Sequence, residues 1–253
     1  LFRSNGLDVR IPEGRECFMM NHKCCCQVTD AVIFDMDGVI VDSEMLYLNL
    51  RWQFAREKNP EVTLEELYPT VGRSSEGSWS LVAEAVHNGM TWQELLAEYR
   101  KTVVCTYASI DFASVFRREM PGVLESLKQR GIRLALASSN GLSIVEKILT
   151  DNGIRPYFEV VVSGESFRRS KPDPEIYLHT ASCLGVEPQR CLVAEDSTAG
   201  ITAAHLAGMR VAAVVDDRFG FDRSLADYEV KQISDILQLV EGKTDEKTGG
   251  QDK

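Results

Sequence analysis

Two aspartates, Asp35 and Asp37, stand two positions apart directly behind the apolar run of residues 31–34, and Gly38 follows them. An apolar run of this kind is typical of a strand that is buried on both faces. Such a strand would place Asp35 at its carboxyl end, where open α/β sheets bind their ligands. Two carboxylates at one strand end repel each other unless a cation or a proton neutralises them. The spacing therefore indicates metal-assisted chemistry, although the same pattern also occurs in turns and in calcium-binding loops.

Polar residues also follow the other strands that the sequence predicts. Apolar runs at 134–137, 160–162, 191–194 and 211–215 are interpreted as strands, with helical segments of about ten residues between them. The polar residues behind these strands are Ser138 and Asn140, Gly164 and Glu165, Glu195 and Asp196, and Asp216 and Asp217. Strands that alternate with helices predict a parallel sheet, whose strands all end at the same edge. We therefore expect these polar ends to converge on the two aspartates.

The segment 44–118 differs from the rest because it shows helical periodicity and no convincing strand. Thr63 with Glu66, and Thr91 with Glu94, have the spacing of capping boxes, which mark the start of a helix. We therefore expect an α-helical cap domain at 44–118 that is inserted into a core formed by 30–43 and 119–241. The remaining segments, 1–29 and 242–253, are expected to be a disordered leader and a disordered tail.

Composition restricts the classes of partner. The chain has 253 residues and a net charge of −10, which disfavours nucleic acid and anionic membranes as partners. No apolar run approaches the roughly eighteen residues that span a bilayer. The seven cysteines are odd in number and include the triplet Cys24, Cys25 and Cys26, which does not suit a disulfide framework. We expect a monomer in the reducing cytoplasm, and a small phosphorylated ligand stays compatible with this composition.

Four short segments together resemble the signature motifs of the haloacid dehalogenase superfamily. They are residues 35–39 (Asp-Met-Asp-Gly-Val), Ser138 behind its strand, Lys171 in Ser-Lys-Pro-Asp-Pro, and residues 195–197 (Glu-Asp-Ser). They occur in the order of the family, and the resemblance covers roughly residues 30–240. The wording is most similar to the β-phosphoglucomutase-like group. This resemblance implies an α/β fold with a Rossmann-like parallel sheet core and an inserted α-helical cap.

The resemblance also implies a role for each residue. Asp35 would be the nucleophile that forms an aspartyl-phosphate, and Asp37 would be the general acid and then the base. Lys171 would neutralise Asp35 and hold a phosphoryl oxygen, and Ser138 and Asn140 would donate hydrogen bonds to the substrate. Mg²⁺ would be held by Asp35, the backbone carbonyl of Asp37, Asp196 and Glu195, although Glu195 could instead be a structural carboxylate.

Three residues of the cap segment bear on the substrate. Glu44 is expected to face it, and Arg73 lies in a segment, 70–75, that resembles the specificity loop of the family, although a surface role fits Arg73 equally well. Tyr47 stands where the mutases of the family carry a histidine, which favours transfer of the phosphoryl group to water. We therefore expect a Mg²⁺-dependent phosphatase acting on a sugar or polyol phosphate. A phosphosugar mutase and a non-catalytic relative that binds a phosphorylated ligand are the alternatives.

Overall fold

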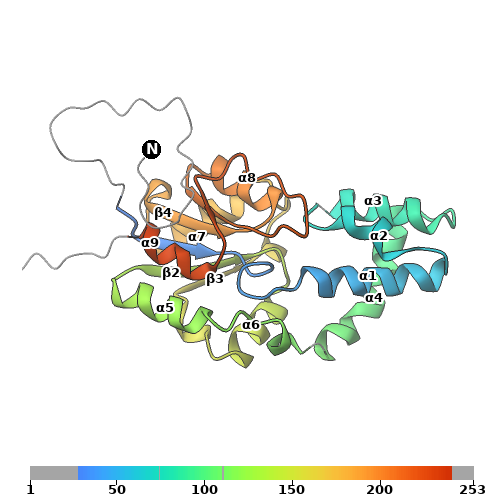
Figure 1. The fold of residues 1–253 in the computed structure, drawn as a ribbon, viewed down its shortest axis with the longest axis horizontal. Coiled ribbons are helices and arrows are strands. Elements are labelled where there is room, and N and C mark those ends of the chain that lie inside the picture. The colour runs from blue at the N-terminus through green and yellow to red at the C-terminus, as the bar shows by residue number, and fades with distance from the viewer. Residues whose placement is uncertain (1–27, 74, 110, 241–253) are drawn as a thin grey trace, which may run out of the picture.

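The computed structural model describes residues 28–73, 75–109 and 111–240 and contains a six-stranded sheet in the order β3-β2-β1-β4-β5-β6 (Figure 1). All of its strand pairs are parallel. The strands are β1 (Ala31–Phe34), β2 (Arg133–Ser138), β3 (Val160–Ser163), β4 (Cys191–Glu195), β5 (Arg210–Val214) and β6 (Tyr228–Val230). The predicted α/β fold with a parallel sheet is confirmed, and β1 lies in the middle of it.

The strand β6 is absent from the sequence prediction, which stopped at five strands. It has only three residues, Tyr-Glu-Val, and pairs with β5 through Val214 and Val230. Short edge strands of this kind carry no continuous apolar run, so periodicity does not reveal them. Because β6 lies at the outer edge, the error leaves the centre of the sheet unchanged.

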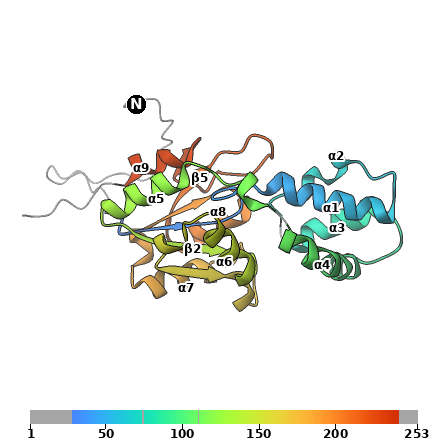
Figure 2. The same ribbon diagram turned by 90° about the horizontal axis from the view of Figure 1, so that it is seen from below.

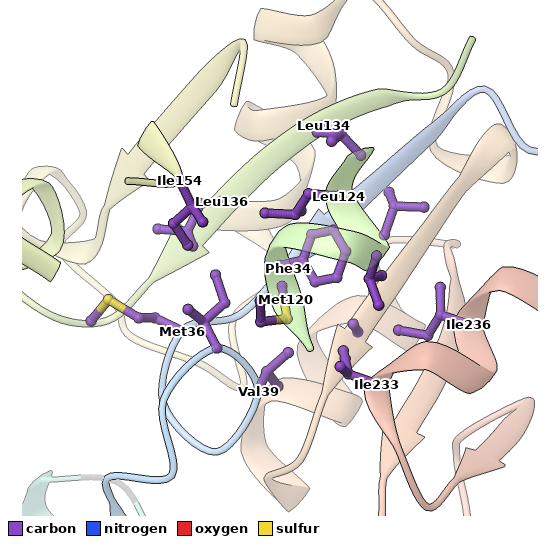
Figure 3. Packing of buried hydrophobic residues seen from close by; sticks show 14 of the residues in the cluster. Phe34, Met36, Val39, Met120, Leu124, Leu134, Leu136, Ile154, Ile233 and Ile236 are labelled. Carbon is purple, nitrogen blue, oxygen red and sulfur yellow. The ribbon is translucent and has the colours of Figure 1, made fainter. Parts of the chain in front are cut away.

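Helices cover both faces of the sheet because its strands are apolar on both sides. On one face lie α5 (Met120–Gln129), α6 (Leu142–Asp151) and α9 (Ile236–Leu239), and on the other lie α7 (Glu175–Leu184) and α8 (Thr198–Leu206). Successive residues of β1 point to opposite faces. Thus Phe34 packs beside Met120 and Leu124 (Figure 3), whereas Ile33 belongs to the apolar cluster under α7 and α8.

Between β1 and α5 the described residues form four α-helices that lie together at one end of the molecule (Figures 1 and 2). They are α1 (Glu44–Lys58), α2 (Leu64–Leu67), α3 (Ser75–Val86) and α4 (Trp92–Ser109). The cap has an apolar cluster of its own, distinct from the two clusters on the faces of the sheet. Its centre is formed by Phe54, Trp79 and Tyr99. Thr63 and Glu66 form the predicted capping box at the start of α2. The division into core and cap domains agrees with this packing and stays a prediction.

Two contacts join the cap helices to the sheet. The chain leaves and returns side by side, since the Asp42 N–H donates to the Val115 carbonyl over 2.8 Å. In addition, Phe219, in the loop behind β5, is buried within the apolar cluster of the cap. Residues 1–27 of the predicted leader (1–29) lie outside the described residues, and so does the whole predicted tail (242–253). Cys24, Cys25 and Cys26 are among them. No helix in the described ranges is long and apolar enough to cross a membrane.

Candidate active site

Asp35 directly follows β1 and is buried, and a tight turn behind it brings Gly38 against Asp196. The turn is closed by hydrogen bonds from the Ile40 N–H to the Met36 carbonyl (2.8 Å) and from the Gly38 N–H to the Val41 carbonyl (2.7 Å). Gly38 has a φ of +70°, and a Cβ at this position would lie 1.9 Å from Asp196 Oδ2. Only glycine combines this backbone conformation with so close an approach.

Lys171 contacts three other side chains of the site. Its Nζ lies 2.6 Å from Asp35 Oδ1, 2.8 Å from Glu195 Oε1 and 2.9 Å from the Tyr177 hydroxyl. The Tyr177 hydroxyl in turn donates to Glu195 Oε1 over 2.9 Å. Burial opposes the charged form of Lys171, but the carboxylates of Asp35 and Glu195 outweigh it and raise the pKa of Lys171 well above its usual value. Lys171 is therefore an ammonium that faces the predicted nucleophile.

The carboxylates around Lys171 fit a divalent cation. Asp35, Glu195 and Asp196 each offer an oxygen, and these oxygens lie within 4.8 Å of one another. Asp196 Oδ2 is buried and has no hydrogen-bond partner among the described residues. Burial raises the pKa of Asp35 to about 8 and the pKa of Asp196 well above its usual value. A cation would stabilise both ionised forms, and an all-oxygen donor set suits Mg²⁺.

Glu195 differs from Asp196 because all of its oxygens are already engaged. Besides Lys171 and Tyr177 at Oε1, its Oε2 accepts hydrogen bonds from the backbone N–H groups of Asp196 (2.9 Å) and Ser197 (3.0 Å). Burial opposes its ionisation, but Lys171 and these N–H groups outweigh burial and lower the pKa of Glu195. Glu195 thus fixes Lys171 and the loop behind β4, which agrees with the structural alternative considered for it.

Asp37 has neutral partners, in contrast to Asp35. Its Oδ1 accepts a hydrogen bond from Ser43 Oγ (2.5 Å) and its Oδ2 accepts one from Asn140 Nδ2 (2.6 Å). Burial raises the pKa of Asp37, and hydrogen bonds from Ser43 and Tyr47 offset part of the rise. Because burial outweighs these hydrogen bonds, Asp37 keeps a proton more readily than an ordinary aspartate, which suits a general acid.

A pocket of about 230 Å³ between the sheet edge and the cap helices brings most of the predicted residues together. The predicted residues in its lining are Asp35, Asp37, Glu44, Arg73, Asn140, Lys171, Glu195 and Asp196. Ser138 is fully buried outside this lining, and its Oγ accepts a hydrogen bond from the Asn140 N–H (3.1 Å). The neighbouring Ser139, which the sequence interpretation did not single out, lines the pocket instead.

The strands β3 and β5 contribute less than expected to this site. Glu165, behind β3, is exposed, and its Oε2 accepts a hydrogen bond from the Leu142 N–H (3.1 Å). Asp216, behind β5, pairs with Arg218 at 2.6 Å. Both ends lie at the predicted edge, but neither lines the catalytic pocket. The site is built by the residues behind β1, β2 and β4, together with Lys171 from the segment before α7.

The cap contributes a polar wall that sequence reasoning only partly found. Glu44 begins α1, and burial followed by the charge of Asp37 raises its pKa to about 7, while Arg51 acts in the opposite direction. Arg51, which was not predicted, donates from Nη1 to Thr70 Oγ1 (2.6 Å). Arg73 is exposed, and its Nε donates to the Pro69 carbonyl (2.7 Å).

Tyr177, in the core helix α7, was also not predicted as a site residue. A tyrosine within the apolar stripe of a helix is usually part of the core.

Comparisons with known proteins agree with this geometry. A profile of haloacid dehalogenase-like hydrolases matches residues 32–214, which include all four signature segments. Hexitol phosphatase B of Escherichia coli K12 is 34% identical over 185 residues, which cover 71% of this chain and 81% of that protein. A phosphorylated carbohydrates phosphatase of Thermotoga maritima is 35% identical over 184 residues, covering 71% and 82%. The crystal structure of β-phosphoglucomutase from Clostridium difficile shares the fold, with a TM-score of 0.67 at 23% identity over 83% of this chain and 93% of that chain.

Proposed function

The chain belongs to the haloacid dehalogenase-like hydrolases, and we propose that it is a Mg²⁺-dependent phosphatase acting on a sugar or polyol phosphate. The observation that carries this proposal is that the two neighbouring aspartates have different partners. Asp35 is paired with the ammonium of Lys171, whereas Asp37 is held by Ser43 and Asn140. One carboxylate is thereby suited to attack and the other to proton transfer. The named activities of the two curated relatives support the same class of substrate.

In the proposed reaction an oxygen of Asp35 attacks phosphorus, and the bond from phosphorus to the substrate alcohol breaks. Asp37 gives its proton to the leaving alkoxide, which departs as the free alcohol, and the phosphoryl group remains on Asp35. Asp37 then takes a proton from water, whose oxygen attacks phosphorus. This second step releases inorganic phosphate and restores Asp35 as a carboxylate and Asp37 as an acid.

The other polar groups hold the phosphoryl oxygens during both steps. Lys171 neutralises Asp35 and offers a donor to the phosphoryl group, and Asn140 and Ser139 face the same pocket. Asp35, Asp196 and the backbone carbonyl of Asp37 would hold Mg²⁺, with Glu195 beside them. When bound, the cation would reduce the repulsion between the Asp35 carboxylate and the phosphate and would stabilise the charge that shifts during transfer.

A phosphate-release assay on hexitol phosphates and other sugar phosphates tests the proposal. We expect Mg²⁺-dependent release that EDTA abolishes and that Asp35→Asn reduces to background. Substantial release by Asp35→Asn, or full activity in EDTA, would contradict the mechanism. For the mutase alternative, the protein is incubated with β-glucose 1-phosphate and a bisphosphate primer. Glucose 6-phosphate that forms faster than free phosphate would overturn the choice of phosphatase.

Three finer points belong to the same proposal. Glu44 and Arg73, which both line the pocket from the cap, are proposed to contact the alcohol part of the substrate. The protein is proposed to act as a monomer in the cytoplasm.

A further inference from the structure

A second, larger cavity adjoins the catalytic pocket. It measures about 680 Å³, against about 230 Å³ for the catalytic pocket, and Gly72, Arg73 and Ala199 line both spaces. Binding sites for small molecules typically measure about 300–1,000 Å³. The larger cavity is therefore big enough for a substantial part of a substrate whose phosphate group lies at Asp35.

One wall of the larger cavity is aromatic and is shared between cap and core. Tyr68 comes from the short helical turn Tyr68–Thr70 of the cap, and Phe219 and Phe221 come from the loop behind β5. The rings of Phe219 and Phe221 are stacked, with centroids 5.6 Å apart at 24°, and Tyr68 lies 6.0 Å from Phe219. Phe219 is buried, whereas Tyr68 is 36% exposed and Phe221 is half-buried. Tyr68 and Phe221 thus keep ring surface available for a ligand.

The cap and core loops meet closely at the boundary between the two cavities. Gly72 has a φ of +69°, and a Cβ there would lie 2.3 Å from Cε1 of Phe221. Glycine at this position lets the cap loop approach the Phe221 ring without a side chain between the two spaces. The two cavities share Gly72, Arg73 and Ala199 in their linings, so a ligand that extends from the pocket at Asp35 into the larger cavity would run beside these residues.

The larger cavity offers fewer polar groups to a polyol chain than the pocket at Asp35 does. Each of its two threonine hydroxyls already makes one hydrogen bond, since Thr198 Oγ1 accepts from the Asp222 N–H (2.8 Å) and Thr202 Oγ1 donates to the Thr198 carbonyl (2.8 Å). Among the described residues no carboxylate lines the cavity, whereas five line the catalytic pocket. Arg218 lies over the ring of Phe219 and pairs with Asp42 and Asp216. This mixture of rings and guanidinium groups suits an electron-rich planar ring, which both groups bind through their faces.

We propose that the larger cavity binds a planar heteroaromatic ring on the alcohol part of the substrate, so that the preferred substrates are ring-bearing sugar phosphates of the nucleoside monophosphate class. This inference rests on the proposed phosphatase function and narrows its substrate. Because Tyr68 belongs to the cap and Phe221 to the core, a ring that contacts both also stabilises the arrangement that encloses the phosphate. Binding of the remote ring then assists the reaction at phosphorus.

Adenosine 5′-monophosphate and ribose 5-phosphate form a matched pair of substrates, since they differ by the base at the anomeric carbon. We expect kcat/KM in Mg²⁺ to be higher for the nucleotide by about fivefold or more, as stacking of a base on aromatic side chains provides. Tyr68→Ala and Phe221→Ala should each reduce this ratio at least about threefold. Tyr157→Ala is the control, because Tyr157 is a half-buried tyrosine that lines neither cavity. A ratio near one in the wild type, or an unchanged ratio in both variants, would overturn the inference.

A binding measurement separates this inference from the proposed function. If neither compound releases phosphate, the phosphatase proposal fails for this class of substrate. The dissociation constants of the two compounds are then measured with the wild-type protein by calorimetry in Mg²⁺. Tighter binding of the nucleotide by about fivefold, lost in Tyr68→Ala, still supports a ring site. Equal or weaker binding of the nucleotide overturns it.

Discussion

Lys171 Nζ lies 2.6 Å from Asp35 Oδ1, although the two residues are 136 positions apart in the chain. The contact joins the turn behind β1 to the segment before α7, and both side chains are buried. A buried ion pair of this kind is costly to break, because each charge left alone lacks solvation. The pair therefore contributes to the integrity of the site as well as to its chemistry.

Replacing this lysine should affect both activity and stability. Lys171→Met leaves the carboxylates of Asp35 and Glu195 without their ammonium, and we expect destabilisation of about 3–5 kcal/mol in EDTA and loss of turnover in Mg²⁺. Urea denaturation and phosphate release measure the two effects. Lys147→Met is the matched control, since Lys147 pairs with Asp151 on the surface of α6 and such pairs contribute below about 1 kcal/mol. Equal stability of the two variants would contradict the assigned role of Lys171.

Tyr177 is expected to act as a positioning residue for Lys171. Tyr177→Phe keeps the ring in the core but removes the hydroxyl between Lys171 and Glu195, a loss of about 1.5–3 kcal/mol for hydrogen bonds to charged groups. We expect a lower kcat, by about tenfold or more, with little change in KM. The control is Tyr157→Phe at the edge of the sheet core. If kcat in Tyr177→Phe matches the wild type, the hydroxyl has only a packing role.

The close contact of Gly38 with Asp196 gives a test of the cation site that does not depend on activity. In Gly38→Ala the new methyl group would displace the Asp196 carboxylate, so we expect Mg²⁺ binding, measured by calorimetry, to weaken at least about tenfold. Gly153→Ala is the control, because Gly153 has a nearly identical φ of +69° and no atom within 4 Å of the added Cβ. Backbone strain is thus common to both variants. Similar Mg²⁺ affinities in the two would show that Asp196 does not bind the cation.

The raised pKa of Glu44 predicts a pH dependence of stability. Between its ordinary value of 4.5 and about 7 the folded protein keeps a proton that the unfolded chain has released, so stability falls as the pH rises through this window. Glu44→Gln removes this titration. In EDTA its Tm relative to wild type should therefore rise from about pH 5 to about pH 7.5. Glu57→Gln makes the same chemical change on the exposed side of α1 and controls for it. Parallel curves for Glu44→Gln and wild type would refute the prediction.

The sequence predicted which residues gather at the sheet edge because the geometry of a parallel sheet converts order in the chain into proximity. Asp35, Asp196 and Asn140 each follow an inner strand, and they meet as that rule requires. Lys171 was placed by resemblance to a family motif, since no strand carries it. Tyr177 was missed because its hydroxyl works from within an apolar helix face.

The aromatic wall of the larger cavity was beyond prediction for a different reason. Phe219 looks like an ordinary loop residue in the sequence, yet it is buried among helices that are more than a hundred positions away. No local periodicity encodes such a contact. The packing of the whole cap decides it, as it does the position of Arg73. Sequence patterns therefore located the residues that line the pocket at the sheet edge but not the aromatic wall of the larger cavity.

Asp42 and Val115, at the two ends of the inserted cap, are neighbours, which has a consequence for protein engineering and for evolution. An insertion whose two ends are neighbours can be exchanged or resized without altering the register of the strands that flank it. The catalytic carboxylates and Lys171 would survive such an exchange, because none of them belongs to the inserted helices. The ring of Phe219, in contrast, packs within the apolar cluster of the cap and would lose these contacts. A transplanted cap would need an apolar cavity that accepts that phenylalanine. The loop behind β5 is therefore the part of the core that must change together with the inserted cap.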